Sequence, residues 1–205
     1  MKLSTSLPIV SIVAFLHAPV HATVAYPSYE TYQADAFVRA ATSCMARSGM
    51  TKRCAKLLEE ATRFDPDRRS IQLLLGQAYL ALDDYSRAQS VFAALLREDP
   101  DLRPALLGLS VIYIRTGELD LALQKIKSFE SAGGHDPEAA YIRAEIAIRQ
   151  GEESKALAQL RQAIREGFDQ RDLVRNAPFW EHARRMKDIQ EWLNAGEMDN
   201  NSPRR

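Results

Sequence analysis

The sequence predicts an all-α solenoid of about four helical hairpins with a C-terminal capping helix. Small side chains recur with a period of 34 residues, at Cys54, Ala88, Ala122 and Ala156. Asp-Pro pairs recur near three of the predicted unit boundaries. Apolar residues follow helical spacing in LLLGQAYLAL and ALLGLSVIYI. A fixed period in the range of roughly 20–50 residues is typical of solenoids, in which each unit buries its apolar face against its neighbours.

Residues 1–22 are predicted to be a secretory signal peptide. Lys2 supplies a charged start, residues 7–16 form an apolar run, and Val20-His21-Ala22 suits cleavage after Ala22. The apolar run is too short to span a bilayer as a helix, which needs about 20 apolar residues. We therefore expect a periplasmic or secreted protein; the alternatives are an N-terminal membrane anchor or a buried helix.

Residues 23–34 form an N-terminal segment with three tyrosines, Tyr26, Tyr29 and Tyr32. Their spacing of three places them on one side of a helix. They are expected to cover the open first helix of the solenoid, as a cap must. The alternative is an interaction patch.

The repeat region is expected to span residues 35–170. Its four units are 35–68, 69–102, 103–136 and 137–170. In the first helix of each unit a small residue is expected to face the second helix, namely Thr42, Gly76, Ser110 and Ala144. Bulkier side chains are expected to fill the space beside these contacts, namely Tyr79, Phe92, Tyr113 and Ile126.

The second unit carries a recognisable pattern. Leu75-Gly76-x-x-Tyr79 is followed by Ala88-x-x-x-Phe92 and by Pro100. This pattern resembles the tetratricopeptide repeat. The resemblance extends over about residues 35–170 and implies a right-handed superhelix whose first helices line a concave groove.

The resemblance also implies which residues line the groove. They are Arg39, Arg47, Leu73, Gln77, Leu107, Val111, Arg115, Tyr141, Glu145 and Arg149. Three arginines, Arg47, Arg115 and Arg149, occupy one equivalent position beside an apolar floor. Such a surface suits an amphipathic helix or extended peptide with carboxylates. Alternatively, some of the leucines belong to the core and the arginines complement helix dipoles.

Two cysteines, Cys44 and Cys54, lie five residues on either side of Gly49, the expected turn of the first hairpin. Their equal distance from the turn supports a disulfide. Rotation argues against it, because Cys44 lies about 160° around the helix from Thr42. An oxidising compartment favours the disulfide, which we therefore expect; the alternative is two small buried apolar side chains.

Residues 171–195 are expected to form the capping helix, which Pro178 opens and which runs to about Asn194. Trp180 and Trp192 are among its apolar residues, and a docking surface is the alternative role. Residues 196–205 are expected to be a disordered tail.

Composition and motifs favour binding over catalysis. The chain has 27 basic and 27 acidic residues, which gives no general electrostatic reason to expect nucleic acid or an anionic membrane. No catalytic motif, phosphate loop or metal-ligand spacing is present in the sequence, so neither enzyme activity nor a cofactor is expected. Stable membrane insertion of the mature chain is not expected either.

The expected function is therefore that of a protein–protein adaptor or scaffold outside the cytoplasm, in the assembly of an envelope complex. It would hold a protein or peptide ligand in the concave groove. One alternative is a self-associating structural subunit, which makes the chain a homo-oligomer. Another is a cell-wall-associated accessory protein.

Overall fold

The computed structural model describes residues 28–200, and the side chains of residues 28–195. The predicted signal peptide and Tyr26 lie outside the described residues. Eight helices form the repeat region: α1 Tyr29–Ser48, α2 Lys52–Phe64, α3 Arg69–Ala81, α4 Tyr85–Glu98, α5 Arg103–Thr116, α6 Leu119–Ser131, α7 Pro137–Arg149 and α8 Glu153–Arg165. The C-terminal region contains α9 Arg171–Asn176, η1 Pro178–Trp180, α10 Glu181–Arg184 and α11 Lys187–Asn200.

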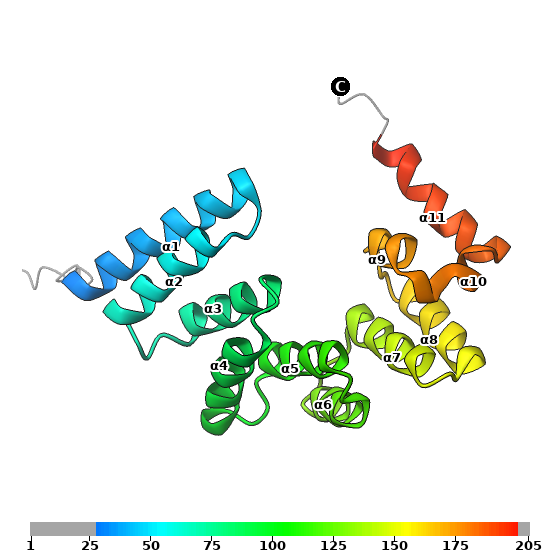
Figure 1. Cartoon of the computed structure of the whole chain (residues 1–205), viewed down its shortest axis with the longest axis horizontal. Helices are drawn as coiled ribbons and strands as arrows, with labels where there is room; N and C mark the ends of the chain where they lie inside the picture. The colour runs from blue at the N-terminus through cyan, green and yellow to red at the C-terminus, as the bar shows by residue number, and fades with distance from the viewer. Residues whose placement is uncertain (1–27, 201–205) are drawn as a thin grey trace, which may run out of the picture.

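Consecutive helices pair as hairpins, and the hairpins stack along the chain. The pairs are α1 with α2, α3 with α4, α5 with α6, and α7 with α8. The first helices of neighbouring units also touch, α3 against α5 and α5 against α7. The chain follows an arc, with α1 and α2 at one end and α9 to α11 at the other (Figure 1). This arrangement confirms the predicted all-α solenoid. Within the described residues, no helix is long and apolar enough to cross a membrane.

A residue with positive φ ends the first helix of the second, third and fourth hairpins. Asp83, Gly117 and Gly151 have φ of 57°, 86° and 80°. The following amide then donates back to a carbonyl five residues earlier, as Glu118 N does to Tyr113 O at 2.7 Å. These bonds satisfy carbonyls that the helix end would otherwise leave unpaired.

Small residues allow close helix contact inside the hairpins, as the repeat predicts. Gly76, Ser110 and Ala144 are buried in α3, α5 and α7. The small residues of the matching second helices, Ala88, Ala122 and Ala156, are fully buried as well, as is Cys54 in the first hairpin. Phe92 on α4 is also fully buried and packs against Gly76 and against Gly108 of the next unit.

The first hairpin departs from the predicted register by one residue. Ala41 is fully buried, whereas Thr42, the predicted contact residue, is exposed and its hydroxyl donates to Val38 O at 2.9 Å. The assignment of Thr42 to the contact was therefore wrong. Ala41 precedes Cys54 by 13 positions, whereas Gly76 precedes Ala88 by 12, so counting 34 residues back from Gly76 misses the contact.

The corrected register explains the disulfide between Cys44 and Cys54. The structure joins the two sulfurs, with the Cα atoms 5.7 Å apart. Cys44 lies only about 60° around the helix from Ala41, so the rotation that argued against the bridge is absent. Both cysteines are buried, and the Thr51 hydroxyl lies 3.0 Å from the Cys54 sulfur. The bridge therefore fastens the two helices next to their turn.

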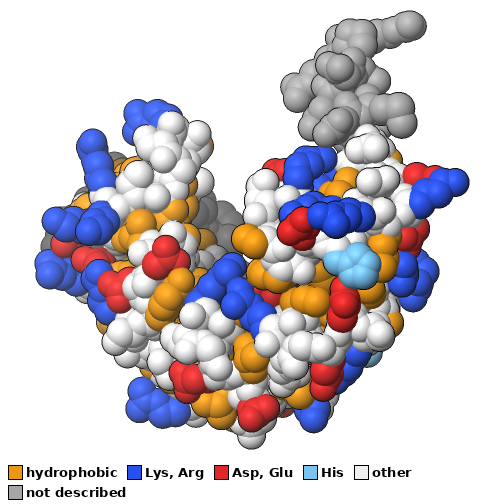
Figure 2. Space-filling view, turned by 45° about the vertical axis from the view of Figure 1, so that its right-hand side comes forward, with side chains coloured by type: hydrophobic (Ala, Val, Ile, Leu, Met, Phe, Trp, Pro, Cys, Tyr) orange, Lys and Arg blue, Asp and Glu red, His pale blue; other side chains and the backbone are white. Residues whose placement is uncertain are grey.

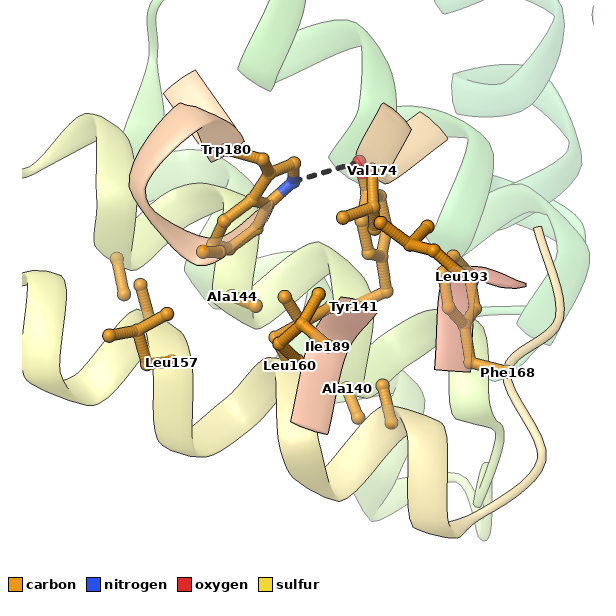
Figure 3. Packing of buried hydrophobic residues seen from close by; sticks show 14 residues of the cluster. Ala140, Tyr141, Ala144, Leu157, Leu160, Phe168, Val174, Trp180, Ile189 and Leu193 are labelled. Atoms are coloured by element: carbon orange, nitrogen blue, oxygen red, sulfur yellow. Dashed lines mark hydrogen bonds between the residues drawn. The ribbon is translucent and has the colours of Figure 1, made fainter. Parts of the chain in front are cut away.

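The C-terminal cap consists of several short helices rather than the single helix expected from Pro178 to about Asn194. Pro178 opens the 3₁₀ turn η1, and α11 begins only at Lys187. Trp180 is fully buried, points toward Tyr141 of α7, and donates from its indole Nε1 to the Tyr141 hydroxyl at 3.4 Å (Figure 3). The prediction of a tail from residue 196 is wrong for residues 196–200, which belong to α11; residues 201–205 lie outside the described residues.

Candidate binding groove

A groove with a cavity of about 600 Å³ lies on the concave side of the arc. Helices α3, α5, α7 and α9 all contribute to it. Apolar side chains make up much of its lining, among them Leu80, Leu107, Val111, Ile114 and Ile142. Figure 2 shows the hollow between the two ends of the solenoid, with basic side chains on its floor.

The repeat itself positions the groove residues. Gln77, Val111 and Glu145 each follow the small residue that faces the second helix of its hairpin. One residue corresponds to about 100° of helix rotation. The side chain after each small residue therefore turns away from the hairpin partner and toward the concave side, where all three line the groove.

Six of the predicted groove residues line this cavity. They are Gln77, Leu107, Val111, Arg115, Tyr141 and Glu145. Leu73 instead packs against the core cluster around Phe92. Arg39 and Arg47 are exposed on α1 and are not part of the cavity. The lining of this cavity begins at Gln77 on α3 and includes no residue of α1. The one-residue register shift also turns both arginines about 100° from the predicted direction.

The predicted row of three equivalent arginines is wrong. The one-residue register shift moves Arg47 out of line with the other two arginines. Arg115 and Arg149 both lie beside the same acidic side chain, Glu145. Glu145 has a side chain only 7% exposed, and Arg149 donates to its Oε1 from Nε at 3.1 Å and from Nη2 at 2.8 Å. Arg115 Nη1 lies 3.9 Å from the same oxygen. The buried carboxylate is therefore neutralised within the protein.

The two arginines differ in how free they are to bind a ligand. The Arg149 guanidinium is held by Glu145 and lies 5.0 Å from the ring centre of Phe179 in the cap. Arg115 is 45% exposed and is loosely paired with Glu145. A guanidinium carries five N–H donors, so Arg115 keeps donors that can face the cavity.

Tyr141 forms the wall of the groove next to the cap. Its ring stacks on Phe168 with the centroids 4.5 Å apart, and the side chain is buried. Burial raises the pKa of the Tyr141 hydroxyl to about 12, because the charged form would lose its hydration. The hydroxyl is therefore neutral at physiological pH and accepts the bond from Trp180.

Several lining residues were not predicted. They include Arg103 and Pro104 at the start of α5, His135 and Asp136 before α7, and Gln170 and Leu173 near α9. A rule based on positions within the first helices does not cover turns and caps. The Asp-Pro pair before α7 could have pointed to the residues at the start of this helix as part of the groove. Asp136 caps α7 by accepting a hydrogen bond from Glu138 N at 2.9 Å.

The side chains that line the groove are suited to binding an organic ligand. Within the part of the chain that the structure describes, no group of three or more His, Cys, Asp or Glu side chains is placed to hold a metal ion. The groove combines an apolar surface with a partly free guanidinium, which is suited to holding an apolar ligand that carries a carboxylate.

Comparison with known proteins agrees with the fold. Residues 55–102 and 73–137 match the tetratricopeptide repeat family. A thermophilic tetratricopeptide-repeat protein of Thermus thermophilus is similar with a TM-score of 0.65 and 18% identity, over 83% of this chain and 92% of the other. None of the curated proteins matches the chain.

Two MamA structures are similar as well. Residues 41 to the end of MamA from Desulfovibrio magneticus RS-1 give a TM-score of 0.59 at 18% identity, over 84% of this chain and 98% of that one. A double mutant of RS-1 MamA gives 0.59 at 17%, over 83% and 97%. At these identities the likeness concerns the fold.

Proposed function

We propose that this chain, whose residues 55–137 carry tetratricopeptide repeats, is a non-enzymatic adaptor or scaffold that holds a protein segment in its concave groove. Repeats of this type form protein-interaction modules, and stacked helix pairs create extended concave binding surfaces. We further propose that it acts outside the cytoplasm, in the assembly of an envelope complex. The ligand is an amphipathic helix or extended peptide that carries a carboxylate.

One observation supports this proposal most strongly: the groove has a largely apolar floor on α5, polar and charged residues at its edges, and a partly free arginine. Its lining extends from Gln77 on α3 to Leu173 in α9, across four helices. An exposed apolar concavity of this kind marks an interaction site. Arg115 supplies a charge that orients an acidic ligand.

The proposed compartment rests on two features. The N-terminal residues fit a signal peptide. The bridge between Cys44 and Cys54 is of the kind that persists in oxidising compartments.

Blocking the groove tests the proposal. Gln77 is exposed and lines the cavity, so Gln77→Trp fills the groove without disturbing the core. Gln89 on α4 is also exposed but does not line the cavity, so Gln89→Trp is the matched control. We expect affinity capture from envelope extract to retain a partner with the wild type and Gln89→Trp and to lose it with Gln77→Trp. Arg115→Gln is expected to weaken the capture.

The same experiment separates the alternatives. Capture of the chain itself, with a mass that rises with concentration, would replace the adaptor by a self-associating subunit. Retention on isolated cell-wall material with all variants would favour a cell-wall-associated protein. Equal capture of one partner by both tryptophan variants would show that the groove is not the binding site.

A further inference from the structure

The N-terminal hairpin concentrates positive charge in a chain that is neutral as a whole. Residues 36–58 contain five basic residues and no acidic residue, in a chain with 27 of each sign. We call these five residues the basic patch: Arg39, Arg47, Lys52, Arg53 and Lys56. The overall balance therefore hides a strong local asymmetry, and a local field of one sign attracts partners of the opposite sign.

The charges of the basic patch are little used inside the protein; in the described part of the chain, Lys52 alone lies near enough to an acid, Asp84 of the second hairpin, to help Arg87 lower the pKa of that carboxyl. All five side chains belong to exposed residues, and among the described residues none of them forms an ion pair; the one internal bond is from Arg47 Nε to Ser43 O at 3.2 Å.

The acids of the hairpin serve other partners. Asp35 pairs with Arg68 at 2.6 Å, and Glu59 pairs with Arg87 at 3.1 Å. Glu60 pairs with Arg63 on its own helix. Glu30 lies in the first turn of α1, at the opposite end of that helix from Arg47. The basic patch therefore faces solvent without compensation from its own hairpin.

The fold fixes the basic patch in place. Arg47 ends α1 and Lys52 and Arg53 begin α2, so these three residues surround the turn of the hairpin. The disulfide holds the two helices together next to this turn. Figure 2 shows Lys and Arg side chains gathered on the upper part of the left-hand arm, which α1 and α2 form.

Two exposed aromatic side chains lie at the other end of α1, beside Glu30. Tyr29 and Tyr32 are 68% and 56% exposed. Tyr32 and Arg39 are seven residues apart, which puts them about 20° apart around α1 and thus on one face. Tyrosine beside lysine and arginine is the combination enriched at membrane–water interfaces, and clustered basic residues bind anionic headgroups.

We propose that the N-terminal hairpin binds the surface of a membrane that contains anionic lipids, with the basic patch on the phosphate groups and the two tyrosines at the headgroup level. The apolar residues 7–16 lie N-terminal to α1, so a signal peptide at this position would bring this end of the solenoid next to the membrane during export. This order favours a lipid surface over an acidic protein. The groove then stays free for its ligand.

Vesicle sedimentation tests the proposal, with the exported chain beginning at residue 23 and its N-terminus checked by mass spectrometry. The probe is phosphatidylcholine vesicles with or without phosphatidylglycerol. The test variant is Lys52→Gln/Arg53→Gln/Lys56→Gln. The control is Arg97→Gln/Lys127→Gln/Arg165→Gln, which removes three exposed charges from α4, α6 and α8. Circular dichroism confirms that both variants fold.

We expect the wild type and the control to sediment with the anionic vesicles and to be released by salt. The test variant should bind about a hundredfold more weakly, because each basic residue near an anionic surface contributes a factor of about five. Three results would overturn the proposal: equal binding to neutral vesicles, equal loss in the control, or no binding to anionic vesicles. Binding to poly-glutamate without binding to vesicles would assign the surface to an acidic protein instead.

Discussion

The ring of Phe92 on α4 packs directly against Gly108 on α5, where a methyl group would lie 2.5 Å from the ring atom Cε2. Gly76 of α3 touches the same ring, with its methyl position 2.7 Å from Cε1. One aromatic side chain thus joins two consecutive units of the solenoid, and glycine in both first helices makes room for it.

Gly108→Ala is expected to destabilise the protein, although alanine is the better helix former by about 1 kcal/mol. The added methyl group overpacks the contact with Phe92, at a cost of about 1–3 kcal/mol. The unfolding free energy from urea denaturation measures the net effect. In a Phe92→Leu background the same substitution should become neutral or stabilising; an unchanged loss there would show that Phe92 is not the cause.

Reduction of the Cys44–Cys54 bridge is expected to lower the unfolding free energy by about 2–3 kcal/mol, because the released loop gains freedom in the unfolded state. Thermal unfolding with and without reductant measures this loss. Cys44→Ala/Cys54→Ala is the control and should not respond to reductant. Alanine suits position 54, since the equivalent residues are Ala88, Ala122 and Ala156. An unchanged midpoint for the reduced wild type would contradict the assigned role.

Arg149→Gln is expected to cost more stability than Arg115→Gln. Glu145 is buried, and Arg149 donates two hydrogen bonds to it, so the loss of Arg149 leaves a poorly compensated charge and costs on the order of 2–3 kcal/mol. Arg115 is more exposed and farther away, and its pairing contributes less than about 1 kcal/mol. Urea denaturation of the two variants compares these losses. Equal losses would contradict the assignment of Arg115 as the freer arginine.

Alkaline destabilisation is expected from Tyr141. Its pKa is raised by burial to about 12 in the folded protein, from a usual value of 10. Between these values the unfolded chain has released the proton and the folded protein still holds it. The unfolding free energy therefore falls with rising pH in this window, by about 1.4 kcal/mol per pH unit.

Tyr141→Phe should remove this part of the pH dependence while lowering stability at neutral pH through the lost bond to Trp180. Denaturation curves between pH 9 and pH 12, a range set by the shifted tyrosine pKa, compare the two proteins. An identical pH slope for the variant would show that Tyr141 does not titrate with unfolding.

The buried contact residues of the solenoid could be predicted because the same contact between two helices recurs every 34 residues. Gly76, Ser110 and Ala144 follow a strict period and are all buried as expected. The first unit could not be placed by the same rule. Ala41 and Thr42 are both small, and the extra residue before Cys54 becomes visible only through burial.

The groove was predicted in part for a related reason. The helical period gives the direction of Gln77, Val111 and Glu145 but not the interactions among groove side chains. The Glu145–Arg149 pair has the i, i+4 spacing of a helical ion pair, which the sequence shows. The sequence does not show that Glu145 is buried or that Arg149 also lies against Phe179 of the cap. The prolines predict helix starts, but the break between α10 and α11 has no comparable signal.

Site-specific photocrosslinking in the intact envelope tests the central claim, that a protein partner occupies the groove between α3, α5 and α7. A photoreactive residue at Gln77 reports on the groove, and one at Gln89 reports on an exposed position outside it. We predict an adduct with another protein from position 77 and none from position 89. An adduct from position 89 without one from position 77 would contradict the claim.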